Sequence, residues 1–447
     1  MDWHAEDASW SNRDFGIFQY EQRRTVVLRK LESNPTVVRS ELRDKQEWED
    51  WFCYDAPSTN PTESGLYVAL CSRATPVFEG SDMPVTNVPV TSDTWERLTR
   101  EFLIHREIRR PISRGVDYFT SHRERDKGGE SKIYFVARMS ASLPKDLALS
   151  VTYIPSKDTT FAVIYGCNEE QMQDIEQRIN KAGDKTKFPL LMVGLLAELE
   201  RERLLDEAED LIDDFTLRSD YFDSESNKIA ADISNEKTQE YVSLCFKSRS
   251  LMDHIKAVKH QLAKLIAEID NFAIEGKRTR RFHKHGALMK NKVLDIIDEC
   301  EFHRHATLMK KRVLDIIDEY DVKINECKMI VEDTTLATQT AYNQIARMDS
   351  AINTMIARQA KLEGTQMRSI ALLTMIYLPF SSVAAIFSMD MFDWKPQTGG
   401  SVVSKYIWVF AAFATGLTAI TFFAWYHITS RHDQIKPDAS WEQGKLV

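Results

Sequence analysis

Two long runs of apolar residues stand near the C-terminal end of the chain. Residues 370–387 include no charged side chain, and residues 402–426 include only Lys405. Each run is long enough to cross about 30 Å of hydrocarbon as a helix. The pattern predicts a transmembrane hairpin, with helices over 367–389 and 402–427 and an outward loop over 390–401. The alternative, a helical hairpin buried inside a globular domain, is disfavoured by the length of the runs and by their lack of charge.

A seven-residue pattern precedes the first run. Apolar and small polar residues alternate at spacings of three and four across 331–362, as they do along a coiled-coil seam. The pattern predicts a stalk helix over 331–366. The positions of the seam are Val331, Thr334, Thr338, Ala341, Ile345, Met348, Ile352, Met355, Gln359 and Leu362.

Residues 189–330 also favour helix, because no proline occurs between Pro189 and Pro379. Apolar residues at helical spacing predict long helices over 190–218 and 239–272. The second half of the first of these helices is acidic. Its carboxylates suit either a solvated surface or a cation sensor, and they are Glu207, Glu209, Asp210, Asp213 and Asp214.

A segment of this region is duplicated: residues 282–300 recur as 302–320. An offset of twenty residues rotates a continuous helix by about 200°. Either the helix breaks between the copies, or one copy lies where its face does not matter. Each copy contains a His-X-His pair, at 283 and 285 and at 303 and 305. In a helix the two rings of a pair diverge by about 200°, which is poor geometry for one metal ion, and we do not expect a metal there.

The first 188 residues have mixed character. Strand-forming residues fill 66–71, 132–137, 147–154 and 159–165, and the last two flank a turn at Pro155. Residues 94–109 favour a helix. We expect an irregular segment over 1–60 and an α/β domain over 61–188. The predicted fold is thus an α+β cytoplasmic domain, a long helical stalk and a two-helix transmembrane hairpin, mostly α overall, with a tail over 428–447.

The basic residues beside the hairpin predict its orientation. They stand before the first span and after the second: Arg358, Lys361, Arg368, Arg431, His432 and Lys436. Positive charge stays on the cytoplasmic side of membranes. We therefore expect both termini in the cytoplasm. The first residues read as neither a signal peptide nor a mitochondrial presequence, which favours the plasma membrane or the vacuole over the mitochondrion.

Composition excludes several classes of function. The net charge of −9 argues against nucleic acid as a partner, because phosphate binding needs a basic surface. The six cysteines are scattered, which is typical of reduced thiols rather than of disulfides or a zinc site. The chain contains no phosphate-binding glycine loop, nucleophile elbow, HExxH or CxxC. We predict that it is not an enzyme.

One stripe of the first span mixes small, hydroxyl and bulky apolar side chains. Its residues are Met367, Ile370, Thr374, Leu378, Ser381 and Ala385, and Ser388 continues it. A seven-residue recurrence places such residues on one side of a helix. The stripe suits the lining of a narrow pore. It suits a helix-packing face equally well, since small and hydroxyl residues serve there too.

The string TMIYLPFSSVAAIFSMDMF, residues 374–392, resembles the first transmembrane helix of the CorA-type magnesium transporters, and the short loop, second span and long preceding helix fit the same family. We identify the chain as similar to a divergent, fungal-type branch. The resemblance implies a homopentamer in which the stalk and first span form a central funnel and pore. It also implies that acidic helices beside the stalk bind regulatory magnesium.

The family's Gly-Met-Asn signature at the outer pore mouth is replaced here by Ser388, Met389 and Asp390. A ring of five Asp390 carboxylates would attract divalent cations. It would also ligate calcium, so magnesium selectivity stays open. The resemblance implies a channel for divalent cations, Mg²⁺ above all, with passive uptake driven by the membrane potential. The alternative is a non-conducting, membrane-anchored interaction protein on the same scaffold.

Overall fold

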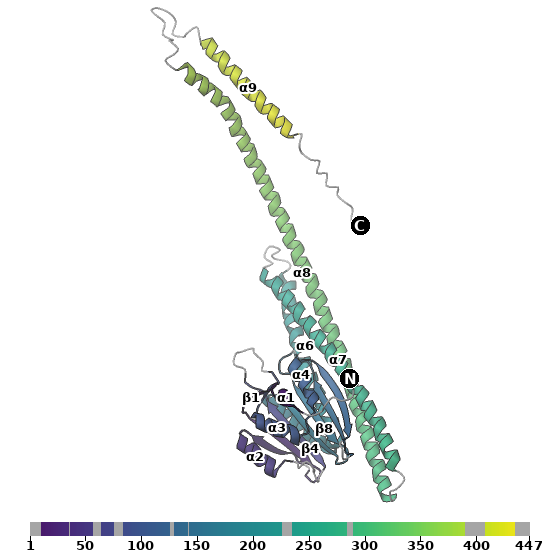
Figure 1. Ribbon diagram of the computed structural model, residues 1–447. Coiled ribbons are helices and arrows are strands. Elements are labelled where there is room, and N and C mark those ends of the chain that lie inside the picture. The colour runs from purple at the N-terminus through teal and green to yellow at the C-terminus, as the bar shows by residue number, and fades with distance from the viewer. Residues whose placement is uncertain are drawn as a thin grey trace, which may run out of the picture. The chain divides into compact units, whose positions relative to one another are not determined.

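A computed structural model describes residues 10–34, 36–56, 64–75, 84–125, 129–141, 143–225, 235–283, 289–388 and 407–433 (Figure 1). The chain divides into two compact units, Met1–Ala341 and Tyr342–Val447. The first holds every described strand and the helices that pack on the sheet. The second holds the C-terminal part of α8 (Met289–Phe387) and α9 (Ile407–Asp433).

A seven-stranded sheet in the order β3-β2-β4-β9-β8-β7-β6 organises the first unit. Its strands β4 and β9 pair in parallel, with Leu66 opposite Thr160, and the other neighbours are antiparallel. The strands are β2 (Thr25–Leu31), β3 (Val38–Leu42), β4 (Gly65–Ser72), β6 (Tyr118–Arg125), β7 (Ser131–Arg138), β8 (Ala148–Ile154) and β9 (Thr159–Cys167). A small parallel pair joins β1 (Gln19–Tyr20) to β5 (Asn87–Val88).

Apolar cores cover both faces of this sheet. Each strand contributes to both cores, because successive strand residues point to opposite faces. Val26 and Leu28 of β2 enter one core, whereas Val27 between them enters the other. Short helices cover the second core with aromatic side chains such as Trp48 and Trp95. These helices are α1 (Asn12–Phe15), α2 (Lys45–Tyr54), α3 (Ser92–Glu101), η1 (Arg106–Ile108) and α4 (Arg109–Arg114).

Longer helices cover the other face (Figure 1). They are α5 (Glu169–Ala182), followed by η2 (Gly183–Lys187), then α6 (Leu191–Glu225), α7 (Asn235–His283) and the N-terminal part of α8. Leu196, Ile255 and Ile316 represent α6, α7 and α8 in this core, and all three are buried. The helix predicted over 190–218 lies within α6 except for its first residue, and the helix predicted over 239–272 lies within α7. The predicted fold class, a mixed α and β domain followed by long helices and two apolar C-terminal helices, is confirmed.

The prediction of an irregular segment over 1–60 is wrong. Strand β2 pairs along its whole length with β4, and β3 extends the sheet beyond β2. Asp44 caps α2 by accepting a hydrogen bond from the backbone N–H of Glu47, at 2.8 Å. The strand TVVLRKL of β2 has clear strand-forming residues, but it is short and stands among charged neighbours.

The single helix predicted over 94–109 is also wrong. Helix α3 ends at Glu101, and the chain turns at Leu103, whose φ of +49° is incompatible with a right-handed helix. The Trp10 indole N–H donates to the carbonyl of Ile104 at 2.8 Å, which holds the segment after the turn. The 3₁₀ turn η1 and the short α4 follow. The proposed domain boundaries themselves stay predictions.

The duplicated segment straddles a helix end. Helix α7 ends at His283 and α8 begins at Met289, both inside the first copy. Helix α8 then runs without a break into the second copy, so of the two alternatives left open by the sequence, a helix break between the copies is excluded. In the second copy Ala306, Val313 and Tyr320 are buried against the domain. The side chains at 275–301 are not among those that the structure describes. The surroundings of the first copy's apolar face are therefore not described.

Candidate functional site

The part of the chain that the structure describes contains two helices long and apolar enough to cross a membrane. They are the C-terminal part of α8, as far as Ile386, and α9 from Ile407 to His427. Both belong to the second unit. The predicted hairpin therefore has its two helices, and the outward loop at 390–401 lies outside the described residues.

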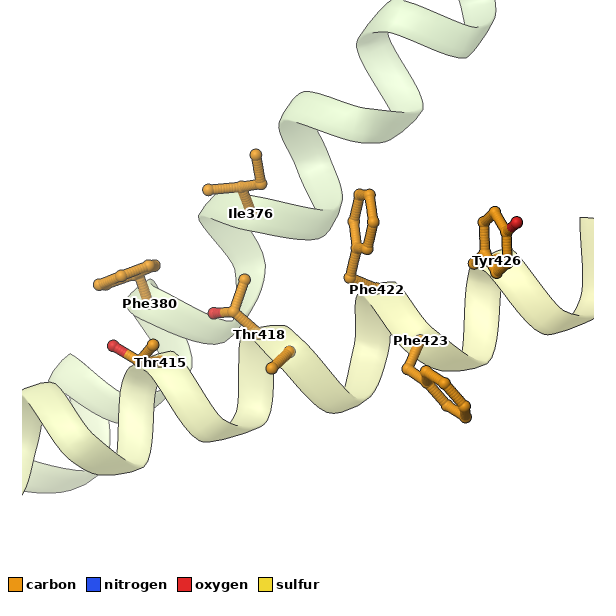
Figure 2. A pocket seen from close by; sticks show the side chains of 8 residues that line it. Ile376, Phe380, Thr415, Thr418, Phe422, Phe423 and Tyr426 are labelled. Carbon is orange, nitrogen blue, oxygen red and sulfur yellow. The ribbon is translucent and has the colours of Figure 1, made fainter.

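Burial marks the face of α8 that lies toward α9. Pro379 and Val383 are buried, and Leu372 and Met375 are half-buried, while the residues around them are exposed. On α9 the corresponding mark is Ala414, which is fully buried. Figure 2 shows Phe380 of α8 beside Thr415 of α9, which is where the two helices approach one another.

The predicted stripe lies on the opposite side of α8. At about 100° per residue, Ile370, Thr374 and Ser381 stand roughly 140–200° around the helix from Pro379. All six residues of the stripe are exposed, with exposed fractions of 74% for Met367 and 60% for Leu378. Helix α9 thus leaves the stripe uncovered. A face of a membrane helix that its own hairpin partner does not cover is open to another copy of the chain, to lipid or to water.

The hydroxyl groups of Thr374 and Ser381 in the stripe donate hydrogen bonds to carbonyl groups of the helix backbone. Thr374 Oγ1 donates to the carbonyl of Ile370 at 2.9 Å, and Ser381 Oγ donates to the carbonyl of Leu378 at 3.0 Å. A hydroxyl keeps two acceptor lone pairs after its proton is used. The oxygen atoms of Thr374 and Ser381 therefore present acceptors on the exposed face, which is the chemistry that a cation or its water shell needs.

Pro379 interrupts α8 between these two hydroxyl groups. It has no backbone N–H, so the carbonyl of Met375 four residues earlier has no intrahelical donor from that position. Proline is tolerated in membrane helices where neighbouring groups compensate for such a loss. Ser382 lies three residues beyond it and donates to the same Leu378 carbonyl as Ser381, at 2.8 Å.

The predicted mouth is only partly described. The backbone N–H of Ser388 donates to the carbonyl of Ala384 at 3.0 Å, so the last helical turn of α8 reaches the first residue of the signature. The Ser388 side chain is exposed. Met389 and Asp390 lie outside the described residues. Their role at a pore mouth stays a prediction, as does the pore-lining role of the stripe.

The stalk seam changes environment along α8. Thr334 and Ala341 of the seam are buried, and both belong to the first unit. In the second unit Ile345 is half-buried and the seam residues from Met348 onward are exposed, with fractions of 54% for Ile352, 73% for Met355 and 65% for Leu362. A row of exposed apolar residues at coiled-coil spacing is typical of a helix that associates with other helices.

The acidic half of α6 forms no metal centre in the described part of the chain, where no group of three or more His, Cys, Asp or Glu side chains is placed to hold one ion. Asp214 pairs with Arg218 at 2.8 Å, and Glu209 lies 3.6 Å from Lys323 of α8. Glu207, Asp210 and Asp213 are exposed. The single chain thus shows a largely solvated acidic surface, and a regulatory Mg²⁺ site there remains a prediction.

Three buried charged clusters in the first unit escape sequence reasoning. Asp146 pairs with Arg73 at 3.0 Å and with Arg138 at 2.6 Å, and all three side chains are at most 9% exposed. Their positions in the sequence carry no shared motif. Only the sheet register, which sets the end of β4 beside β9 and β7 beside β8, brings them together.

The other two clusters have shifted pKa values. Burial raises the pKa of Glu200 on α6, although Arg203 at 2.6 Å and the Ser140 hydroxyl partly offset it. Burial also raises the pKa of Asp14, but hydrogen bonds from Ser11, Arg106 and Arg109 outweigh it and hold that pKa well below its ordinary value. The lowered pKa of Asp14 means that its charge stabilises the α/β domain, whereas the raised pKa of Glu200 means that burial of its charge costs stability. His105 stacks on His122, and burial and the neighbouring ring lower the pKa of His105.

Comparison with known proteins finds no matching family model and no matching curated protein. The solved structures that are similar to the chain include the following three. The alignment with the full-length CmaX protein covers 92% of this chain and 99% of the CmaX chain, with 12% identity and a TM-score of 0.39. The complete CorA magnesium transporter from Methanocaldococcus jannaschii covers 90% and 96%, with 11% identity and a TM-score of 0.37.

The soluble domain of that same CorA covers 70% of this chain and 97% of its own, with 11% identity and a TM-score of 0.35. The similarity therefore includes the family that residues 374–392 resemble. At these identities and TM-scores the likeness concerns the fold alone. It does not indicate which residues of this chain carry a function.

Proposed function

We propose that the chain is a membrane channel for divalent cations, with Mg²⁺ as the principal cargo, and that it acts as a homopentamer. The observation that carries the proposal is the exposed stripe of α8. It lies in a membrane span, faces away from α9, and presents the oxygen atoms of Thr374 and Ser381 among apolar side chains. Five copies of this face around one axis make a narrow path lined by hydroxyl acceptors.

The order of the stripe along α8 gives the path its parts. Asp390, two residues after Ser388 in the sequence, would stand at the outer mouth and attract cations by charge, as acidic rings do. Ser381 and Thr374 supply acceptors within the span. Leu378 and Met367 form apolar rings that close the path by excluding water. The membrane potential drives entry, at about 2.3 kcal/mol per charge for each 100 mV.

The seam in the second unit supports the assembly. The exposed apolar residues Met348, Ile352, Met355 and Leu362 continue the stalk pattern up to the span. In an oligomer they pack against the same residues of neighbouring copies, which removes them from water. A parallel bundle built on this seam holds the α8 helices of the copies around one axis.

Uptake into cells that lack their own magnesium transport tests the function. The full chain restores growth at low magnesium and takes up Mg²⁺, with Ca²⁺ and Co²⁺ measured alongside it. Asp390→Ala lowers the uptake at least tenfold, and Asp390→Asn retains more of it because an amide oxygen still accepts hydrogen bonds.

The uptake assay also separates the channel from the non-conducting scaffold. A protein that reaches the membrane as a pentamer but restores neither growth nor uptake is the anchored interaction protein. Unchanged uptake and selectivity in Asp390→Ala would remove that carboxylate from the pathway. Surface labelling of the expressed protein, with the same yield for each variant, excludes differences in expression as the cause.

A further inference from the structure

An apolar groove of about 640 Å³ lies between the two membrane helices. Ile376 and Phe380 of α8 form one wall. The other wall comes from α9, and it consists of Thr415, Thr418, Ala419, Phe422, Phe423 and Tyr426. Figure 2 shows the helices close at Phe380 and Thr415 and farther apart toward Tyr426, so the groove widens in that direction. Its volume is in the range of small-molecule sites.

The lining offers few free polar groups. Thr418 Oγ1 donates to the carbonyl of Ala414 at 2.7 Å, so its proton is already used within α9. The rest of the wall is aliphatic or aromatic, except for the hydroxyl group of Thr415 at the narrow end and the phenol group of Tyr426 at the wide end (Figure 2). The groove is therefore mostly apolar along its length, and its wide end carries a phenol group. An acyl chain that ends in a polar head group has the same profile.

The position of Tyr426 fits a membrane surface. It stands near the C-terminal end of the second span, on the side where α8 enters the membrane and α9 leaves it. Tyrosine is enriched at this level of a bilayer, where its ring lies in hydrocarbon and its hydroxyl group contacts head groups. Arg368 is exposed on α8 eight residues before Ile376, which corresponds to about 12 Å along a helix. A cationic side chain at that depth favours an anionic head group.

The direction of the groove selects lipid over a second copy as its occupant. This step rests on the proposed function, in which the stripe faces the central axis. At about 100° per residue, Ile376 lies roughly 140–160° around α8 from Ser381 and Leu378, and Phe380 lies roughly 100–160° from them. A face more than about 90° from the axis points outward from a ring of subunits. The outward side of a membrane protein is in contact with lipid.

We propose that this groove binds one phospholipid per protomer, with an acyl chain along Phe422 and Ile376 and the head group near Tyr426 and Arg368. With both termini in the cytoplasm, the lipid belongs to the cytoplasmic leaflet. The bound chain fills the space between α8 and α9 and fixes their separation. It thereby holds the stripe of α8 toward the axis.

Native mass spectrometry of the full-length protein tests the site. The protein is purified in mild detergent and exposed to vesicles of phosphatidylglycerol and phosphatidylcholine. We expect one retained phospholipid per protomer, with phosphatidylglycerol preferred. Ala419→Trp fills the groove and lowers the retained lipid at least tenfold. Ala424→Trp is the matched control, since Ala424 is also exposed on α9 but lies outside the groove, and it retains lipid as the unmodified protein does.

A photocrosslinking residue at position 423 gives a second measurement that does not depend on filling the groove. Phe423→benzoylphenylalanine forms an adduct with phospholipid if the proposal holds. A crosslink to a second copy of the chain, or equal lipid retention in Ala419→Trp and the control, overturns it. Both readouts are independent of conduction. Lipid retention without ion flux contradicts only the channel, and flux without retention contradicts only the lipid site.

Discussion

At the scale of single residues, the same kinds of side chain have different roles according to their surroundings. Asp146 is buried between Arg73 and Arg138, and its carboxylate forms an ion pair with each of them. Ser381 and Thr374 instead stand exposed in a membrane span, with their protons bound to the backbone and their oxygen lone pairs free to accept. The first arrangement stabilises a fold. The second is suited to contact with a cation.

Asp146→Asn lowers the stability of the α/β domain by about 3 kcal/mol, because it leaves the charge of buried Arg138 without its partner. Asp93→Asn is the control, since Asp93 pairs with Lys45 at the exposed surface and its loss costs less than about 1 kcal/mol. Thermal unfolding of the purified full chain, followed by tryptophan fluorescence, measures both. Equal melting temperatures for the two variants would contradict the account of the cluster.

The pH dependence of Asp14 follows from its lowered pKa. A carboxyl group whose folded-state pKa is depressed stabilises the fold above its ordinary pKa of 3.8, and the contribution is lost as the pH falls below that value. Asp14→Asn removes the contribution. The difference in melting temperature between the unmodified protein and the variant is therefore full at neutral pH and narrows below pH 3.8. A difference that is constant with pH would show that the charge of Asp14 is not the cause.

Ser381→Ala and Ser382→Ala form a matched pair for the pore lining. Both hydroxyl groups donate to the Leu378 carbonyl, but Ser381 lies within the stripe, and Ser382 lies outside it, about 100° around the helix from Ser381. We expect Mg²⁺ uptake to fall severalfold in Ser381→Ala and to stay unchanged in Ser382→Ala. The same uptake in both variants would assign the stripe to helix packing instead.

At the scale of elements, length and period decided what the sequence could predict. The two apolar helices, α6, α7 and the stalk have patterns that repeat over many turns, and the structure has helices there. The region before residue 60 has only short elements, whose pattern becomes recognisable once β2 lies beside β4. The charged clusters could not be predicted, because Arg73 and Asp146 meet only through the register of the sheet. Asp390 lies outside the described residues.

A charge placed in the exposed half of the stalk seam is expected to disrupt the oligomer. Ile352→Asp places a charge in the apolar interface between copies, so the oligomer dissociates or is reduced at least tenfold in amount. Ser350→Asp introduces the same charge two residues away, off the seam, and leaves the assembly intact. Native mass measurement of the two variants distinguishes them. Pentamers of equal abundance in both would exclude the seam as an interface.

At the scale of the whole molecule, the two units differ in the features that they contain. The first is an α/β domain with two apolar cores, one on each face of its sheet, and long helices over one face. The second presents an exposed seam, an exposed stripe and an apolar groove on a pair of helices that a membrane would surround. In the part of the chain that the structure describes, none of these features is covered, and the oligomer and the bound lipid that we propose would cover them.

Ion flux through the purified full chain in phospholipid vesicles tests the central claim most directly. Vesicles with an imposed inside-negative potential contain a magnesium-sensitive dye and protein whose oligomeric state has been measured. The account predicts Mg²⁺ entry that increases with the potential and falls at least tenfold in Asp390→Ala. Intact pentamers that admit no divalent cation at any potential would contradict it.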